Sequence, residues 1–459
     1  MTYASHLSFI KTIAAQSPNQ LLFKLPILEP SEPNSGGHTI LGWKDITYSQ
    51  FLSDVERLAK YWLNVLGYAD GHGSTIGLWM AGMTYTDVVH LFSLMTAGFV
   101  PHTLDLNFQV FTIIALDSDE LADKALDDMP LPSDRQDKAG NDIIMMHHTS
   151  GSTSGRPKIV RLTQSWFSAA LVQMKNAGCI VLTPWVDFTP EELLQIIKEC
   201  KINTIHQFSA LLNRTLREAT TNLELELALK SLEFIGHTGS SIGKEESKWA
   251  IEHEIPLRDL FGSTETGVLM ASLTNDTILY PIKLPGIVYE FWPVDATRVG
   301  LTSSGLFELV IPRVSLDCPF FCDPKEGHHR TKDLFEEVHP GAYKYRGRLD
   351  DMIKMENASI CDTRYIETQV SDSCKDLISC CVVVGSNRPS PVLLVEPLSD
   401  DIDRTKLKEK IGTKVQLINK NSYSHERIDP SHILIVQRGG LPRTSAGRKP
   451  FSRFEGSKE

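Results

Sequence analysis

Residues 147–164 read HHTSGSTSGRPKIVRLTQ, and positions 149–155 within this stretch hold only threonine, serine and glycine. Glycine adopts backbone dihedrals that other residues avoid, so such a loop can turn several N–H groups toward one point, and hydroxyl side chains add donors. Lys158 follows the stiff Pro157 and supplies a mobile positive charge. The stretch therefore predicts a loop that binds phosphate oxygens.

The spacing around this loop differs from that of the nucleotide-binding P-loop, which requires Gly-x4-Gly-Lys-Ser/Thr followed by a helix. The β-branched run IVRLT at 159–163 predicts instead that a strand leaves the loop. The alternative is a flexible serine and glycine linker. Linkers lie between domains, whereas apolar DIIMMHH at 142–148 precedes this loop and a strand follows it, which favours phosphate binding.

Composition limits the class of protein. With 459 residues, 41% of them hydrophobic and 22% charged, the chain is long enough for two or three domains. The net charge of -11 includes no polybasic block, so we expect no nucleic-acid partner. The eight cysteines are dispersed, and the sequence has neither a signal-peptide pattern nor an apolar run of about 18 residues. We therefore expect a cytoplasmic protein with reduced thiols and no membrane span.

Strand-like and helix-like segments alternate in the first part of the chain. The strand-like segments are 74–80, 179–185 and 203–208, and the helix-like segments are 85–99 and 191–201. This alternation predicts an α/β fold, with mainly parallel sheets covered by helices. From about residue 285 the segments 305–314 and 341–355 are rich in strand formers and turn glycines, which predicts antiparallel sheet.

The last part of the chain predicts a small α+β domain. Strands are expected at 380–385, 391–397 and 432–437, and a charged helix at 404–412. We place the boundary near Asp350, so that 1–349 form a large N-terminal domain with a strand-rich subdomain and 350–459 form a small C-terminal domain.

Five motifs follow one another along the sequence. They are the loop described above, LFGSTETG at 260–267, TKDLF at 331–335, YRGRLDDMIK at 345–354 and LPRTSAGRK at 441–449. In this order and rough spacing, over nearly the whole chain, they resemble the adenylate-forming enzymes, a superfamily that includes acyl-CoA synthetases, luciferases and the adenylation domains of peptide synthetases. The details of HTSGST, GSTETG and GRLDDMI are most similar to fungal adenylation domains of peptide-synthetase-like reductases.

The resemblance implies a reaction in two steps. A small carboxylic acid attacks the α-phosphate of ATP, giving an acyl-adenylate and pyrophosphate, and a thiol then takes the acyl group. No carrier or reductase sequence follows Glu459. We therefore expect the thiol to belong to a separate molecule, either free CoA or the phosphopantetheine of a carrier protein, with a separate reductase as a further partner.

The resemblance also implies residues for the phosphates, the metal and the base. The phosphate loop corresponds to Thr149, Ser150, Gly151, Ser152, Thr153 and Gly155, with Lys158 beside it. In the 260–267 motif, Phe261 with Gly262 matches the position that stacks on adenine. Thr264 matches the residue that contacts the α-phosphate. Glu265 matches the ligand of Mg²⁺, an ion that prefers oxygen ligands. Gly239, Ser240 and Ser241 match the segment that lines the adenine and acyl pocket.

Three further positions correspond to the sugar site and the hinge. Asp333 is similar to the carboxylate that accepts both ribose hydroxyls, Arg348 to its basic neighbour, and Asp350 to the hinge about which the mobile C-terminal domain rotates between the half-reactions. Each match has a structural alternative. Thr264 and Glu265 could cap a helix. Asp333 could cap or pair structurally, and Arg348 with Asp350 could form an exposed turn. The series of five motifs favours the functional assignments.

The sequence also departs from the family pattern. The phosphate loop carries one extra residue, Ser154 or its neighbour, and Gly447 is followed by Arg448, with Lys449 one place later than the catalytic lysine of the family. A planar guanidinium can hold phosphate without replacing a lysine aimed at the carboxylate. We therefore expect Arg448 to contact phosphate, Lys449 to take the role of the lysine, and adenylation to be slow.

Two regions are shorter than in the family, one after AGFVPHTLDL and one between WFSAALVQM and CIVLTPW. In the family, the residues missing from the second region form one wall of the acyl pocket. They include the aspartate that pairs with the ammonium group of an amino-acid substrate. This favours an aryl, keto or fatty acid as substrate. Three alternatives stay open: an unusually open pocket, a compensating fold, or a degenerate homologue that binds nucleotide or a partner protein with little catalysis.

Overall fold

The computed structural model divides the chain into two units, which we describe separately. The first comprises Met1–His148, Ile159–Val288 and Pro312–His329, and the second comprises Thr149–Lys158, Tyr289–Ile311 and Arg330–Glu459. The residues that the structure describes are 7–29, 39–67, 74–80, 84–104, 130–131, 140–148, 159–168, 178–183, 188–239, 241–273, 275–294, 305–320, 326–349, 352–356, 360–399, 403–420, 422 and 424–441.

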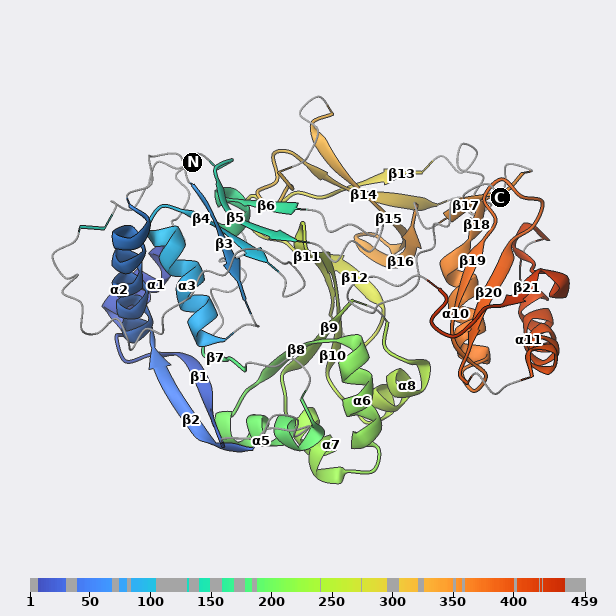
Figure 1. Cartoon of the computed structure of the whole chain (residues 1–459), viewed down its shortest axis with the longest axis horizontal. Helices are drawn as coiled ribbons and strands as arrows, with labels where there is room; N and C mark the ends of the chain where they lie inside the picture. Colours follow the sequence, from blue (N-terminus) through green and yellow to red (C-terminus); the bar gives the residue numbers. More distant parts are fainter. Residues whose placement is uncertain are drawn as a thin grey trace. The chain divides into compact units, whose positions relative to one another are not determined.

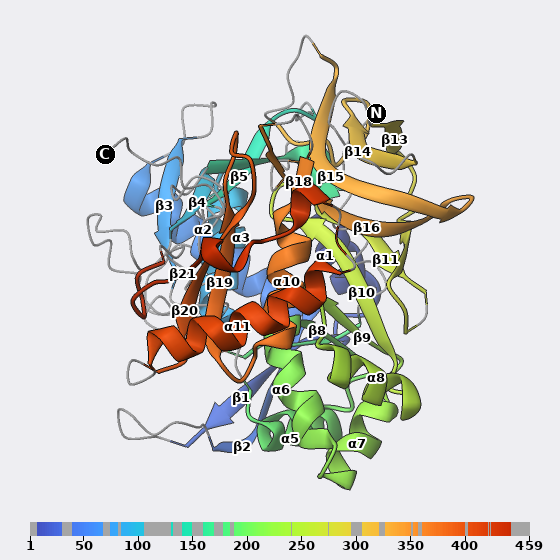
Figure 2. The ribbon, with the colours of Figure 1, turned by 90° about the vertical axis from the view of Figure 1, so that its right-hand side faces the viewer.

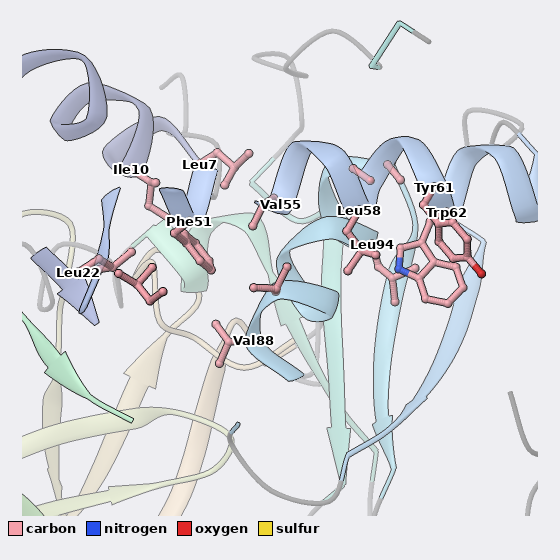
Figure 3. Close-up of a cluster of buried hydrophobic side chains, with 14 of the residues drawn as sticks. Leu7, Ile10, Leu22, Phe51, Val55, Leu58, Tyr61, Trp62, Val88 and Leu94 are labelled. Carbon is pink, nitrogen blue, oxygen red and sulfur yellow. The ribbon is translucent and has the colours of Figure 1, made fainter. Parts of the chain in front are cut away.

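The first unit contains a hydrophobic core built around two helices, α2 and α3. The elements of this region are α1 (Ser8–Gln16), β1 (Leu21–Leu28), β2 (Ile40–Thr47), α2 (Tyr48–Leu66), α3 (Tyr85–Thr96) and β7 (Ile180–Val181). α2 begins with a capping box, in which the Thr47 side chain and the Gln50 side chain each accept from the other's backbone N–H. Figure 3 shows Val55 and Leu58 of α2 in a cluster with residues of α3. Apolar residues at helical spacing thus bury one face of each helix.

A four-stranded sheet carries the loop singled out by the sequence. Its strands are β3 (Thr75–Trp79), β4 (Val100–Leu104), β5 (Ile143–His148) and β6 (Ile159–Thr163), in the order β3-β4-β5-β6 (Figure 1). β3, β4 and β5 are parallel, and β6 returns antiparallel to β5 with His148 paired to Ile159. The expectation that a strand leaves the loop is therefore confirmed.

A second sheet of the first unit carries the 260–267 motif. Its elements are α5 (Pro190–Cys200), β8 (Thr204–Phe208), α6 (Ser209–Ala219), α7 (Leu223–Lys230), β9 (Phe234–Thr238), α8 (Lys244–Glu252), β10 (Leu257–Ser263), β11 (Gly267–Ser272) and β12 (Ile278–Pro281). β8, β9 and β10 are parallel, and β11 and β12 continue the sheet antiparallel. Helices α5 to α8 share a core with Ile235 and Leu257 of the sheet. The predicted helix-covered parallel sheet is therefore present.

The second unit begins with antiparallel strands. β13 (Glu290–Pro293), β14 (Leu306–Pro312), β15 (His328–His339) and β16 (Ala342–Arg348) lie in this order, and the β13–β14 and β15–β16 pairs are antiparallel. Leu309 and Phe335 have no solvent exposure, so this sheet contributes to a core. The antiparallel character predicted after residue 285 is confirmed.

The rest of the second unit is an α+β arrangement with its own core, which includes Ile366, Val383 and Leu407. Its elements are β17 (Met352–Lys354), β18 (Ile360–Asp362), α10 (Thr363–Ser373), β19 (Ile378–Val384), β20 (Val392–Pro397), α11 (Arg404–Asn419), the 3-10 turns η2 (Ser424–Glu426) and η3 (Pro430–His432), and β21 (Ile433–Ile435). Helices α10 and α11 pack with the sheet β19-β20-β21 (Figure 2). The predicted fold class is confirmed.

Two predictions, the strand at 179–185 and the domain boundary at Asp350, include residues outside the described part of the chain. Of the strand expected at 179–185, the described residues Ile180 and Val181 pair with β1, whereas Pro184 and Trp185 lie outside the described residues. The second unit includes 289–311 and 330–349, which the sequence analysis assigned to the large domain, and Asp350 lies outside the described residues. The domain boundary and hinge at Asp350 therefore stay predictions.

No helix within the described part of the chain has both the length and the apolar character that crossing a bilayer requires.

Candidate active site

The 260–267 motif forms a tight hairpin between β10 and β11. Ser263 pairs with Gly267 at its end, the Thr266 N–H donates to the Ser263 carbonyl at 3.3 Å, and the two hydroxyl oxygens of Ser263 and Thr266 are 3.0 Å apart. Thr264 and Glu265 occupy the tip of this turn, where Thr264 is exposed and Glu265 half-buried. Because strands flank the turn, the alternative in which these two residues cap a helix does not hold.

Two glycines make this hairpin sterically feasible. A Cβ atom on Gly262 would lie 2.1 Å from the carbonyl oxygen of Gly267, a contact that no side chain tolerates. Gly267 itself has a φ of +71°, which favours glycine, and the indole of Trp166 lies 3.4 Å from the position of a Cβ there. Gly262 therefore has a structural reason to be glycine, since the backbone of the turn approaches itself closely, and its predicted place in the adenine site stays a prediction.

The carboxyl ends of three parallel strands meet beside this hairpin. Phe208 at the end of β8 pairs with Thr238 at the end of β9, and Gly239 follows with a φ of +90°. The Phe208 ring lies 3.3 Å from the position that a Cβ on Gly239 would take. Phe261 belongs to β10, which pairs with β9. The structure therefore brings Gly239 and Phe261 to one edge of the sheet, the edge at which open α/β sheets bind ligands.

A row of polar side chains lies just below this edge, and the sequence analysis did not identify it. Gln207, His237 and Asp259 are in register on β8, β9 and β10. The His237 Nδ1 is 3.9 Å from the Asp259 carboxylate and 3.2 Å from the hydroxyl of Ser209. Within the described part of the chain, the buried Gln207 Oε1 has no hydrogen-bond partner.

Burial changes the protonation of this row. It raises the pKa of Asp259 to about 6 and lowers the pKa of His237 to about 4. Residues two apart in a strand point to the same face, so Asp259 lies on the same face of β10 as Phe261. The signal available in the sequence was this i, i+2 spacing of a carboxylate and an aromatic ring in DLFG at 259–262.

In the second unit, Asp333 and Arg348 face each other on paired strands, in register across β15 and β16. The Arg348 Nη1 lies 3.4 and 3.3 Å from the two carboxylate oxygens of Asp333, and the Tyr345 hydroxyl donates to Oδ1 at 3.2 Å. Asp333 is only 8% exposed. The alternative of an exposed turn therefore does not hold for Arg348, and Tyr345 is a partner of Asp333 that the sequence analysis missed. The signal was its place in the same motif, three residues before Arg348.

Several predicted site residues lie outside the described residues, and their roles stay predictions. They are Thr149, Ser150, Gly151, Ser152, Thr153, Gly155, Lys158, Ser240, Asp350, Arg448 and Lys449. Ser241 is described and exposed.

Three histidines lie on β4 and on β5, the strand that directly precedes residues 149–158. The rings of His102 and His148 stack with centroids 4.6 Å apart, and the His147 Nδ1 is 2.8 Å from the Thr103 hydroxyl. Burial, together with the neighbouring imidazoles, lowers the pKa of both His102 and His147. At neutral pH these two rings are therefore uncharged in the described structure.

Known proteins match the C-terminal part of the chain and, in one relative, nearly its whole length. A family model described as the AMP-binding enzyme C-terminal domain matches residues 350–450. The chain is 29% identical over 521 residues to the AMP-binding domain-containing enzyme iboA of Amanita muscaria, covering 96% of this chain and 98% of that protein. Since 521 exceeds the 459 residues of this chain, the relative contains segments that have no counterpart here.

Two further relatives match over shorter regions. The chain is 25% identical to a carboxylic acid reductase of Neurospora crassa, over 48% of this chain and 21% of the reductase. It is 26% identical to an L-proline--[L-prolyl-carrier protein] ligase of Pseudomonas fluorescens, over 39% of this chain and 38% of the ligase. The chain thus spans well under half the length of these two proteins.

Solved structures agree in fold. The O-succinylbenzoate coenzyme A synthetase of Bacillus subtilis in complex with AMP has a TM-score of 0.70 at 14% identity, with 98% of both chains covered. An anthranilate CoA ligase in complex with anthranoyl-AMP has a TM-score of 0.66 at 14% identity, covering 98% of this chain and 96% of that chain. These solved structures show that the chain shares the fold of adenylate-forming ligases, and its residues 350–450 match the model of the AMP-binding enzyme C-terminal domain.

Proposed function

We propose that this protein activates a small carboxylic acid with ATP and transfers the acyl group to a thiol. In the first step a carboxylate oxygen bonds to the α-phosphorus, the bond from that phosphorus to the bridging oxygen breaks, and pyrophosphate leaves. In the second step a thiolate attacks the acyl carbonyl and AMP leaves. Catalysis of the first step requires donors and positive charge fixed around the phosphates.

The observation that carries this proposal is the Asp333 site. Asp333 is a buried carboxylate that Arg348 and Tyr345 hold by hydrogen bonds, and an ionised carboxylate only accepts hydrogen bonds, so a ligand of this group must offer donors. Neighbouring hydroxyls of a ribose are donors of the required kind. The guanidinium of Arg348 pairs with the carboxylate and orients it for them.

The edge formed by Gly239 and Phe261 is our candidate for the adenine site. Gly239 follows β9 at this edge, and Phe261 on the neighbouring strand is an aromatic side chain of the kind on which adenine stacks. Asp259 lies on the same face of β10, so we propose that its carboxylate accepts a hydrogen bond from the exocyclic amine of the base.

The turn at the tip of the β10–β11 hairpin fits a magnesium ion. The carboxylate of Glu265 and the hydroxyl of Thr264 are hard oxygen donors on adjacent residues. In the described part of the chain, no group of three acidic, histidine or cysteine side chains could hold a metal. Mg²⁺ characteristically uses one or two carboxylates together with water and substrate phosphates, so Glu265 is sufficient on the protein side. Bound there, the ion would neutralise phosphate charge.

Two acceptors are consistent with the relatives. The Pseudomonas ligase is named for a carrier protein, and two of the structural neighbours are named for coenzyme A. We propose a thiol of this kind, CoA or a carrier-bound phosphopantetheine, with a separate carrier protein or reductase as partner. Arg448 and Lys449 are proposed to act on the phosphates and on the carboxylate during adenylation, and Asp350 to be the hinge.

The test is acid-dependent exchange of radioactive pyrophosphate into ATP, screened over aryl, keto and fatty acids. Asp333→Asn and Glu265→Gln should each lower exchange at least tenfold, roughly the value of a charge-assisted contact. The matched control is Glu336→Gln on the same strand, an exposed carboxylate paired with Arg346, which should leave exchange unchanged. Exchange that persists in Asp333→Asn would contradict the assignment.

A second candidate function is nucleotide or partner binding with little catalysis. It is favoured by the position of Arg448 directly after Gly447 and by the segments of the fungal relative that have no counterpart here. Tight Mg-ATP binding measured by calorimetry, without exchange for any acid in the panel, would favour this candidate over the enzyme.

A further inference from the structure

Lys332, directly before Asp333, has a backbone conformation that residues other than glycine rarely adopt. Its φ is +64°, in the left-handed region. There the Cβ of an L-residue crowds the backbone, so the conformation persists only where neighbouring contacts enforce it. The residue is exposed to solvent.

Two hydrogen bonds hold the Lys332 backbone. Its N–H donates to Oε1 of Glu308 at 3.1 Å, and its carbonyl oxygen accepts from the N–H of Leu349 at 2.7 Å. Glu308 belongs to β14 and Leu349 follows β16, the strands on either side of β15. The contacts therefore come from both neighbouring strands and fix the peptide groups on both sides of the Lys332 Cα.

Glu308 can hold the Lys332 backbone because its own carboxylate is fixed in place. It is 1% exposed, and a carboxylate so buried is costly unless it is paired. Its Oε2 accepts from Nε of Arg330 at 3.0 Å and also from Nη2 of the same guanidinium. One carboxylate oxygen is thus occupied by Arg330, and the other is left for the Lys332 amide.

The constrained residue controls the direction in which the chain enters Asp333. The Asp333 N–H donates to the hydroxyl of Thr331 at 3.1 Å, and that hydroxyl donates to the carbonyl of Leu309 at 2.8 Å. We propose that Glu308 is a positioning residue for nucleotide binding: by holding Lys332 in the left-handed conformation, it aims the Asp333 carboxylate at the ribose hydroxyls. This inference rests on the proposed function, in which Asp333 binds the sugar.

The test measures discrimination between ATP and 2′-deoxy-ATP as the ratio of kcat/KM values in pyrophosphate exchange. Glu308→Met removes the acceptor at similar volume and should lower the preference for ATP about tenfold, the worth of an aligned hydrogen bond to a charged group. Glu308→Gln keeps an oxygen that can accept from the Lys332 amide and should keep most of the preference. A general loss of stability would lower activity with both nucleotides and leave the ratio unchanged.

A second substitution separates backbone strain from other effects. In the Glu308→Met background, Lys332→Gly should restore part of the preference, because glycine enters the left-handed region without strain. Lys332→Ala is the matched control, since it removes the same side chain but keeps the Cβ, and it should restore nothing. An unchanged ratio in Glu308→Met, or equal rescue by alanine and glycine, would overturn the proposal.

Amide hydrogen exchange of the unaltered protein gives a measurement that does not depend on a folded variant or on catalysis. The Lys332 amide should be protected to the level of the strand amides around it, whereas exchange at the rate of an open loop would overturn the proposal. If the unaltered protein does not distinguish the two nucleotides, the assignment of Asp333 in the proposed function fails. The exchange result then still decides whether Glu308 holds the Lys332 backbone.

Discussion

The carboxylate of Asp333 and the guanidinium of Arg348 meet across paired strands, with Nη1 3.4 and 3.3 Å from the two oxygens. The residues are 15 positions apart in sequence, and the β15–β16 register brings them together. The Asp333 side chain is largely buried, so its charge is screened less by solvent than that of a surface pair. This pair is therefore both a structural contact and the best-formed part of the proposed nucleotide site.

Arg348→Ala should weaken nucleotide binding. Without the guanidinium, the carboxylate loses the partner that favours its charged form and fixes its orientation, and we expect the KM for ATP to rise about tenfold with a smaller change in the KM for the acid. Arg346→Ala is the control, because Arg346 pairs with Glu336 on the exposed side of the same strands. Steady-state kinetics of both variants would test this, and equal effects would contradict a specific role for Arg348.

Gly262→Ala should disrupt the hairpin of the 260–267 motif. The new methyl group would meet the Gly267 carbonyl oxygen at 2.1 Å, and since this oxygen belongs to the backbone, the turn itself must shift. We expect a loss of about 3 kcal/mol in the free energy of unfolding and loss of ATP binding. The control is Gly42→Ala in β2, where a Cβ has no heavy atom within 4 Å. Urea denaturation should find the control within about 0.5 kcal/mol of the unaltered protein.

Asp259 and His237 should give opposite contributions to the pH dependence of stability. Burial raises the pKa of Asp259 from 3.8 to about 6, so the folded state binds the extra proton and stability falls as pH rises from about 4 to 6. Burial lowers the pKa of His237 from 6.5 to about 4, so the unfolded state binds the extra proton and stability rises over a similar range. In the unaltered protein the two slopes largely cancel.

Replacing either residue should leave the pH dependence of the free energy of unfolding that the other residue causes. Asp259→Asn should become more stable by about 2 kcal/mol relative to the unaltered protein as pH rises from 4 to 6.5, a value reduced for the partial exposure of Asp259. His237→Gln should show the reverse trend. Denaturation curves at half-unit pH steps would measure both, and parallel profiles for the three proteins would show that the two groups do not titrate as described.

Glu396 should stabilise the end of the last described segment. This carboxylate has no solvent exposure, and it accepts from the Leu441 N–H at 2.7 Å and from the Cys380 thiol at 3.2 Å. Glu396→Ala leaves these donors unpaired and should cost about 3 kcal/mol, whereas Glu396→Gln keeps an acceptor and should cost about half as much. Leu441 begins the motif that holds Arg448 and Lys449, so trypsin should also cleave after Arg443 faster in the alanine variant. Identical cleavage rates would contradict this role.

Local sequence patterns predicted most of the elements. The helices at 85–99 and 191–201 and the strands at 203–208, 305–314 and 391–397 all appear at or near those positions, because amphipathic spacing and turn residues are properties of neighbouring positions. For the strand predicted at 179–185, the described residues show pairing with β1 at Ile180 and Val181. The Tyr345 contact and the row of Gln207, His237 and Asp259 were missed, because each depends on the register between strands.

The sequence by itself determined the fold class and the order of the five motifs, since these depend on periodicity and covalent order, and the nucleotide roles of the motif residues were implied by a family resemblance. The tertiary structure decided which of those residues meet. It placed Arg348 against Asp333, set Thr264 and Glu265 at the tip of a hairpin, and held Lys332 in a left-handed conformation through the buried Glu308. Such contacts join positions far apart in the chain, and their geometry follows from strand register and burial, which no local pattern contains.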